Sequence, residues 1–190
     1  MLARLGAESE TLLDIVDDEL VGSLIQPTRS SYRYMLARVY GFEAPVGTAV
    51  LQAPNLDANF ARPRLRSSRL AADLIALTIS PTEQALLSRR HVVPTIRSAG
   101  EALGWLYVLE RLAQRIAPLS RHLYDRLPHE VVAAGSYVQS AHEPSLFGLG
   151  DALDLMSRTS AMADRIAAGA NAGFRSLQAW LAATPPWDGF

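Results

Sequence analysis

Histidine and arginine are the side chains of this sequence most suited to chemistry. The four histidines are His91, His122, His129 and His142. No two of them are four residues apart, which is the helical spacing at which two imidazoles bind one metal ion. The chain has no cysteine and no lysine, so thiolate ligands, cysteine nucleophiles and Schiff-base chemistry are excluded. The sequence therefore predicts neither a metal site nor a catalytic nucleophile.

All 18 strongly basic side chains of the chain are arginines. A planar guanidinium can bind a carboxylate through two parallel hydrogen bonds, whereas an ammonium group acts as a point charge. Four arginines gather in one short segment, at Arg62, Arg64, Arg66 and Arg69. This segment is a candidate site for an anion or an acidic partner, with a solvated basic face as the alternative.

The composition is that of a folded globular domain. Apolar residues make up 49% of the 190 residues, charged residues make up 19%, and the formal net charge is −1. So small a charge gives no field that would attract nucleic acid or an anionic membrane. No apolar run approaches the ~20 residues of a membrane span, and the first residues lack a signal-peptide pattern. We therefore expect a cytoplasmic protein without nucleic-acid or membrane partners.

Apolar residues recur at helical spacing along the chain, and no segment alternates as a half-buried strand would. The pattern predicts an all-α fold with one helical domain, residues 1–184, and a non-helical tail, residues 185–190. We expect Pro45 to kink or break the second helix, because proline lacks the amide hydrogen that a helix interior needs. The predicted helices cover residues 12–24, 29–45, 65–77, 81–87, 95–128 with a kink at Pro118, and 149–183, with a loop at 52–63 and a mixed segment at 129–144.

Two helix starts carry local signals. Thr28 follows Pro27 and is a predicted N-cap, because its hydroxyl can accept a hydrogen bond from a free amide of the first turn. Ser80 and Glu83 have the spacing of a capping box, with Pro81 at the first helical position.

Four segments occur in an order and at a spacing that resemble the haem oxygenase family, in particular the bacterial type associated with bacteriophytochromes. They are Tyr32–Phe42, Leu65–Leu74, Ala102–Glu110 and Ala170–Phe174, the last followed by Trp180 and Leu181. The resemblance implies a single-domain haem-oxygenase-like helical bundle. It also implies haem held between a proximal and a distal helix and opened to biliverdin, iron and carbon monoxide.

The residues that hold haem in that family are missing. The family's proximal histidine ligates the iron, and the equivalent position here is Glu10, although the acidic residue that follows it in the family matches Asp14. No histidine occurs before His91, so this departure does not depend on the alignment. The resemblance therefore leaves the proximal side without its iron ligand.

The distal helix has changed as well. The family follows the segment containing Tyr107 with glycines that let the backbone approach haem, whereas this chain has a glycine-free window at residues 111–116. Arg111 and Arg115 lie one helical turn apart on one face. We expect them to pair with acids such as Glu10 or Asp14 and to fill the former haem site.

These departures predict a haem-oxygenase-like protein that has lost haem degradation and binds no cofactor. It would act as a regulatory or protein-interaction module, with a bacteriophytochrome or a histidine kinase as the expected partner and a homodimer left open. Trp187 and Phe190 in the tail are candidate docking residues, with packing onto their own domain as the alternative. Two alternatives also stay open: an active haem oxygenase with a non-standard iron ligand, and a non-catalytic tetrapyrrole carrier.

Overall fold

The computed structural model of the chain describes residues 1–89, 92–93, 95–141 and 145–183, and every regular element in that part is a helix. The all-α fold class is therefore confirmed. The α-helices are α1 (Leu2–Val16), α2 (Arg29–Leu51), α3 (Ala58–Ala61), α4 (Ser67–Ala76), α5 (Pro81–Arg89), α6 (Ala99–Ile116), α7 (Leu119–Arg126), α8 (Pro128–Ala134), α9 (Ser136–Ser140), α10 (Ser145–Met156) and α11 (Ser160–Ala183). Shorter turns cover Asp17–Val21, which is π-helical, and Gly22–Leu24 and Arg62–Arg64, which are 3₁₀-helical.

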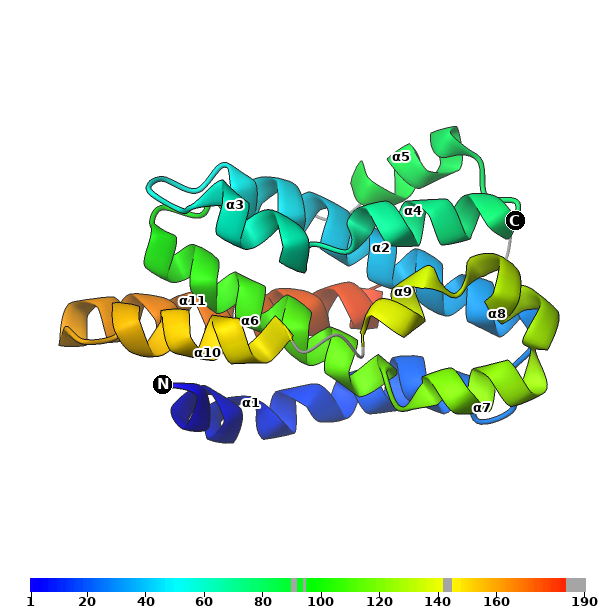
Figure 1. Cartoon of the computed structure of the whole chain (residues 1–190), viewed down its shortest axis with the longest axis horizontal. Helices are drawn as coiled ribbons and strands as arrows, with labels where there is room; N and C mark the ends of the chain where they lie inside the picture. The colour runs from blue at the N-terminus through cyan, green and yellow to red at the C-terminus, as the bar shows by residue number, and fades with distance from the viewer. Residues whose placement is uncertain (90–91, 94, 142–144, 184–190) are drawn as a thin grey trace.

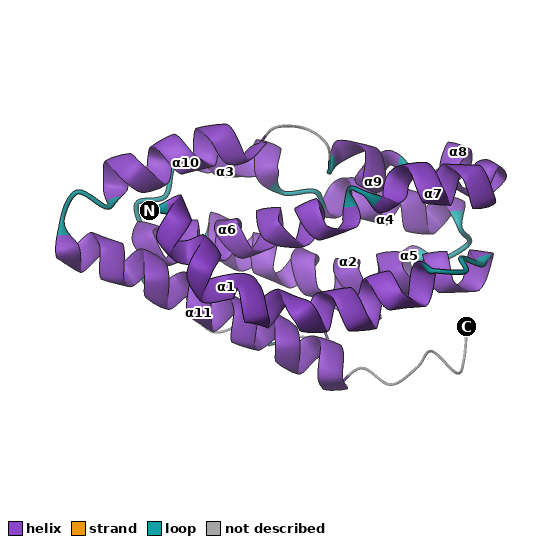
Figure 2. Cartoon of the chain, turned by 90° about the horizontal axis from the view of Figure 1, so that it is seen from below, coloured by secondary structure: helices purple, strands orange, loops and turns teal. Residues whose placement is uncertain are grey.

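Helices α6 and α11 lie side by side and form the most extensive helix pair of the bundle (Figure 1). Helix α1 packs along α11, and α2 packs against α4 and α5 on the opposite side of the molecule. The view in Figure 2 shows that α7, α8 and α9 gather at one end of the bundle, beside α4. No helix in the described ranges is both long and apolar enough to cross a bilayer.

Glycine lets the central pair approach closely. A methyl group on Gly104 of α6 would collide with the carbonyl oxygen of Ile166 of α11. A methyl group on Gly169 of α11 would collide in turn with the carbonyl oxygen of Glu101 of α6. Backbone meets backbone at this crossing, so only residues without a side chain fit.

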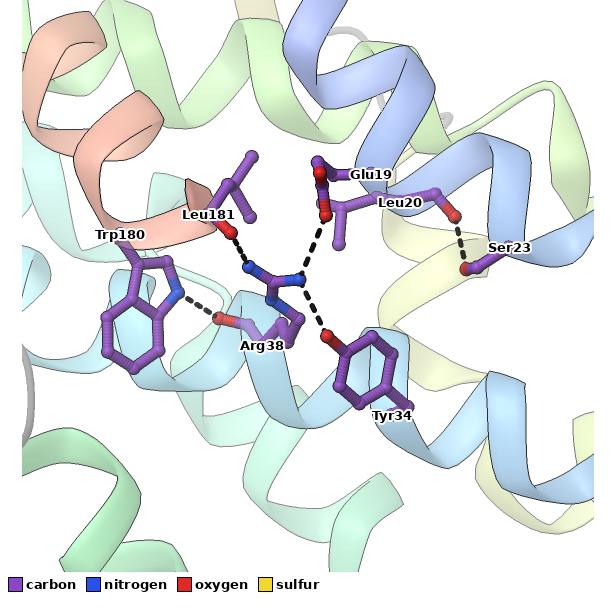
Figure 3. Close-up of polar contacts among 7 residues, drawn as sticks. All are labelled: Glu19, Leu20, Ser23, Tyr34, Arg38, Trp180 and Leu181. Carbon is purple, nitrogen blue, oxygen red and sulfur yellow. Dashed lines mark hydrogen bonds and ion pairs between the residues drawn. The ribbon is translucent and has the colours of Figure 1, made fainter. Parts of the chain in front are cut away.

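A buried arginine ties the end of α11 to α2 (Figure 3). Nη1 of Arg38 donates to the hydroxyl of Tyr34 over 2.7 Å and lies 3.4 Å from the carboxylate of Glu19. Nη2 of Arg38 donates to the carbonyl oxygen of Leu181, and Nε1 of Trp180 donates to the carbonyl oxygen of Arg38 over 3.0 Å. The bond from Arg38 satisfies the carbonyl oxygen of Leu181, which the last turn of α11 would otherwise leave without a partner.

Both predicted helix starts are confirmed. The amide of Ser31 donates to Oγ1 of Thr28 over 3.0 Å. The amide of Ser80 donates to Oε2 of Glu83 over 2.6 Å, and the amide of Glu83 donates to Oγ of Ser80 over 3.3 Å.

Of the kink or break expected at Pro45, the break does not occur. Helix α2 continues through Pro45 to Leu51. Proline in a helix interior costs about 3 kcal/mol, whereas each large apolar side chain that is fully buried contributes roughly 1.5–3 kcal/mol. Val46 and Val50 lie beyond the proline and are both fully buried, so their packing keeps this part of the chain helical.

Several other predicted boundaries differ from the structure, and the first helix begins at Leu2 instead of residue 12. The expected loop at 52–63 contains one helical turn, α3, because the Asp57 carboxylate accepts the amide of Asn59 over 2.9 Å. The expected helix at 149–183 is two helices, because Ser157 ends one and Thr159 caps the next. Pro118 separates α6 from α7 instead of kinking one helix. The tail at 185–190 lies outside the described residues.

Candidate functional site

Helices α1 and α6 carry Glu10 and Tyr107, the positions at which the resemblance predicts the two sides of a pocket. Tyr107 of α6 is buried, and its hydroxyl lies 3.5 Å from Oγ of Ser9 on α1. On its other side the Tyr107 ring meets the edge of Phe174 of α11, with ring centroids 6.2 Å apart and planes at 81°. Tyr107 therefore occupies the space between three helices as a core residue.

Apolar side chains are buried on both helices as well. The inward face of α1 and the π-helical turn after it presents residues that are at most 2% exposed: Leu5, Leu13, Val16 and Leu20. Leu103 and Leu106 of α6 are buried as well. Spacings of eight, three and four residues put Leu5, Leu13, Val16 and Leu20 on one side of the helix, which is the side that packs into the core.

Glu10 is not on that inward face. Its side chain is 70% exposed, and Asp14 is exposed too. Ser9, one position earlier, faces Tyr107 instead. A side chain at position 10 therefore projects from the rim of the α1–α6 interface, away from where an iron atom bound between the helices would lie.

The predicted ion pair across the rim is present in part. Nη2 of Arg115 lies 3.8 Å from Oε1 of Glu10, and Nη1 of Arg115 lies 3.3 Å from Oδ2 of Asp17. Asp17 takes the place expected of Asp14, which has no ion pair within the described ranges. The Arg111 guanidinium lies over the Tyr107 ring at 5.9 Å and makes a cation–π contact.

The four arginines at 62–69 do not form one basic face. Arg62 is exposed and Arg69 is half-buried. The Arg64 guanidinium stacks 3.8 Å from the centroid of the Phe60 ring, and its Nη1 donates to the carbonyl oxygen of Phe60 over 2.5 Å. Arg66 lies in the interior and is only 4% exposed. Arg66 therefore cannot belong to a surface site for an anion, and the prediction at the other three positions stays a prediction.

Arg66 belongs to a buried charged cluster that the sequence analysis missed. Its Nη2 lies 3.0 Å from Oε2 of Glu110 on α6, and its backbone amide donates to Oε1 of Glu43 on α2 over 2.5 Å. Burial raises the pKa of Glu43 to about 7 and raises the pKa of the nearby Tyr137 phenol well above its usual range. We call Glu43, Arg66, Glu110 and Tyr137 the interior cluster.

A second buried carboxylate holds α9 against α4. Asp73 of α4 accepts the amides of Ser136 over 3.1 Å and Tyr137 over 2.8 Å, so it caps the N-terminus of α9. The hydroxyl of Tyr32 on α2 donates to the carbonyl oxygen of Ala134 over 2.6 Å. These bonds anchor the segment that carries Tyr137.

Two of the four histidines, His122 and His129, lie within the described residues. Nε2 of His122 lies 3.2 Å from the carbonyl oxygen of Ile25, and His129 is exposed. His91 and His142 lie outside the described residues. Within the described ranges, no three histidine, cysteine, aspartate or glutamate side chains are placed to hold a metal ion.

An open groove of about 490 Å³ follows the outer face of α2. Its lining is uncharged, and consists of Tyr40, Ala44, Pro45, Thr48, Ala49 and Gln52 of α2 together with Val93.

Comparison of the chain with models of protein families, with curated proteins and with solved structures finds no match. The haem oxygenase resemblance therefore rests on the four sequence segments alone.

Proposed function

We propose that this protein is a non-catalytic helical module of haem-oxygenase-like type that acts through contacts with other proteins and not through haem. The observation that carries the proposal is the closed α1–α6 interface. Leu13 of α1 and Tyr107 of α6 are buried on the two helices between which the resemblance would place the macrocycle, and the Glu10 side chain is exposed.

The energetics of this interface argue against haem binding. Haem would need a slot between α1 and α6 and a ligand directed into that slot. Opening the slot would expose Leu13, Val16 and Leu20, which are all at most 1% exposed. Each exposed side chain would cost roughly 1.5–3 kcal/mol, and no iron bond from the inward face of α1 would offset that cost.

The resemblance also suggests the class of partner. It points to a cytoplasmic signalling protein of the bacteriophytochrome or histidine kinase type. The uncharged groove along α2 supports a role in protein contacts, because its lining of small apolar and amide side chains suits a protein surface better than a charged ligand.

Titration of the purified protein with hemin, followed by Soret absorbance, tests the proposal. We expect no saturable shift. The variant Glu10→His should behave in the same way, because position 10 projects from the rim and an imidazole there would not reach the interior. A control titration of the unfolded chain measures nonspecific hemin adsorption.

A Soret shift of the unmodified protein that saturates at one equivalent of hemin would overturn the proposal. Addition of a reductant and oxygen then separates the two rivals. Formation of biliverdin would identify a haem oxygenase with a non-standard ligand, and bound haem that stays intact would identify a tetrapyrrole carrier.

A further inference from the structure

The end of α11 is fixed against the middle of α2 (Figure 3). Nε1 of Trp180 donates to the carbonyl oxygen of Arg38 over 3.0 Å, and the Arg38 guanidinium donates to the carbonyl oxygen of Leu181. A methyl group on Gly41 would lie only 2.6 Å from the Trp180 ring, so the indole packs directly on this glycine. Helix α11 ends two residues after Leu181, and the chain therefore leaves it beside Gly41.

The open groove on α2 continues the face of the helix on which Gly41 lies. Four of its lining residues follow Gly41 at spacings of three, four, seven and eleven residues, namely Ala44, Pro45, Thr48 and Gln52. Residues at these spacings share one face of an α-helix. Trp180 thus covers the start of this face, whereas the face beyond it is a groove of about 490 Å³. We call it the α2 groove.

Residues 184–190, which follow α11 along the chain, are long enough to reach the far end of the α2 groove. A polyproline segment rises about 3.1 Å per residue, so these seven residues reach about 22 Å. An α-helix rises about 1.5 Å per residue, so Gly41 and Gln52 lie about 17 Å apart along α2. A segment that leaves α11 beside Gly41 can therefore follow the groove over its whole length.

The composition of residues 184–190 also suits the α2 groove. The lining of the groove is uncharged, and the half-buried Tyr40 gives it an aromatic wall. Two consecutive prolines favour the polyproline conformation, which loses little conformational entropy when it binds an aromatic-lined groove. Trp187 and Phe190 supply large apolar surfaces, and Asp188 is the single charged side chain of the segment.

We propose that residues 184–190 bind in the α2 groove of their own chain, with the Trp187 indole packed on its apolar lining. Binding removes apolar surface of both the groove and the indole from water, which is the driving force. The proposal goes beyond the proposed function, because it needs neither the haem oxygenase resemblance nor a partner. A protein that uses the α2 groove as its contact surface must displace this segment, so the segment is an internal competitor.

Quenching of tryptophan fluorescence by acrylamide tests the proposal in the full chain. Subtracting the signal of Trp187→Phe, in which the buried Trp105 and Trp180 remain, isolates the emission of Trp187. We expect its quenching constant to be at least about 3-fold lower than that of a synthetic peptide of residues 184–190, because the bound state dominates the population. The emission maximum of Trp187 should also lie at a shorter wavelength than that of the peptide.

Thr48→Glu tests whether the α2 groove is the binding site. Thr48 is exposed, so the variant should fold, but the new carboxylate would line the groove and repel Asp188. We expect its Trp187 quenching constant to rise to within about 1.5-fold of the peptide value. Thr48→Val loses the same hydroxyl bond to the carbonyl oxygen of Ala44 without adding a charge, and Ala161→Glu adds a carboxylate at the exposed opposite end of α11. Both controls should keep the protection of Trp187.

Equal quenching of Trp187 in the unmodified protein and in the peptide would overturn the proposal. Protection that survives in Thr48→Glu would overturn it as well, because the segment would then lie on another surface. Repeating the measurement over a range of protein concentrations separates one chain from two. Protection that is independent of concentration supports the contact within one chain, whereas protection that disappears on dilution would assign the groove to the segment of a second copy and refute it.

Discussion

Helix α6 separates two regions that use the same pair of chemical groups in opposite ways. On the side facing α1, Arg115 meets Glu10 and Asp17 at the rim, where its side chain is 30% exposed. On another side, Glu110 meets Arg66 in the interior, where both side chains are at most 4% exposed. Arginine–carboxylate pairs therefore occur both on the surface and in the core of one helix bundle.

The difference shows where charge influences this fold. A rim ion pair adds little to the free energy of unfolding, because water and salt screen its charges and its long side chains lose conformational freedom when they pair. An interior ion pair stabilises the fold no more than well-packed apolar residues of similar volume would. Removing one partner nevertheless destabilises the fold, because it leaves a buried charge without compensation. Helix α1 is thus held by buried apolar side chains, whereas the interior around Arg66 and Glu110 depends on its charges staying balanced.

The largest expected effect is that of Arg66→Met. The variant keeps much of the apolar stem but leaves Glu110 and Glu43 buried without their cation, so the free energy of unfolding should fall by about 3–5 kcal/mol. Urea denaturation at neutral pH measures it. A loss below about 1 kcal/mol would mean that water already reaches the cluster.

A smaller loss of stability is expected when the hydroxyl of Tyr32 or of Tyr137 is removed, and the two variants can be compared directly. Tyr32→Phe removes the hydroxyl that donates to the carbonyl oxygen of Ala134 and leaves this acceptor buried, so it should cost about 1–3 kcal/mol. Tyr137→Phe removes a hydroxyl without a hydrogen-bond partner in the described part, so it should change stability by less than about 1 kcal/mol. Thermal unfolding of the two variants side by side measures the contrast, and equal losses would show that the Tyr137 phenol does make a bond.

The sequence predicted most of the helices because their signals are local. Apolar spacing marked the buried faces, and the caps at Thr28 and Ser80 marked two starts. The predictions failed where packing overrides local signals, as at Pro45, where buried valines beyond the proline keep α2 helical. They also failed at Ser157–Thr159, where a short turn interrupts an otherwise continuous helical pattern.

The two charged regions also differ in how far the sequence predicts them. The pairing of Arg115 with Glu10 was predictable, because helical spacing and the resemblance brought those positions together. The interior cluster was not, because its members are spread from position 43 to position 137 and share no motif. One signal was available: Glu43 lies at helical spacing from Val39, Val46 and Val50, so a carboxyl group occupies a core-facing position.

The smallest expected effect belongs to the rim. Arg115→Met removes the cation between Glu10 and Asp17 and should lower the free energy of unfolding by less than about 1 kcal/mol. Because the pair is partly exposed, that loss should shrink toward zero in about 1 M salt, where the Debye length is only ~3 Å. Urea denaturation at low and high salt measures this dependence, with Arg66→Met as the comparison, whose larger loss should persist because salt does not reach the interior. A salt-independent loss at Arg115 comparable to that at Arg66 would show that the rim is as buried in solution as the core.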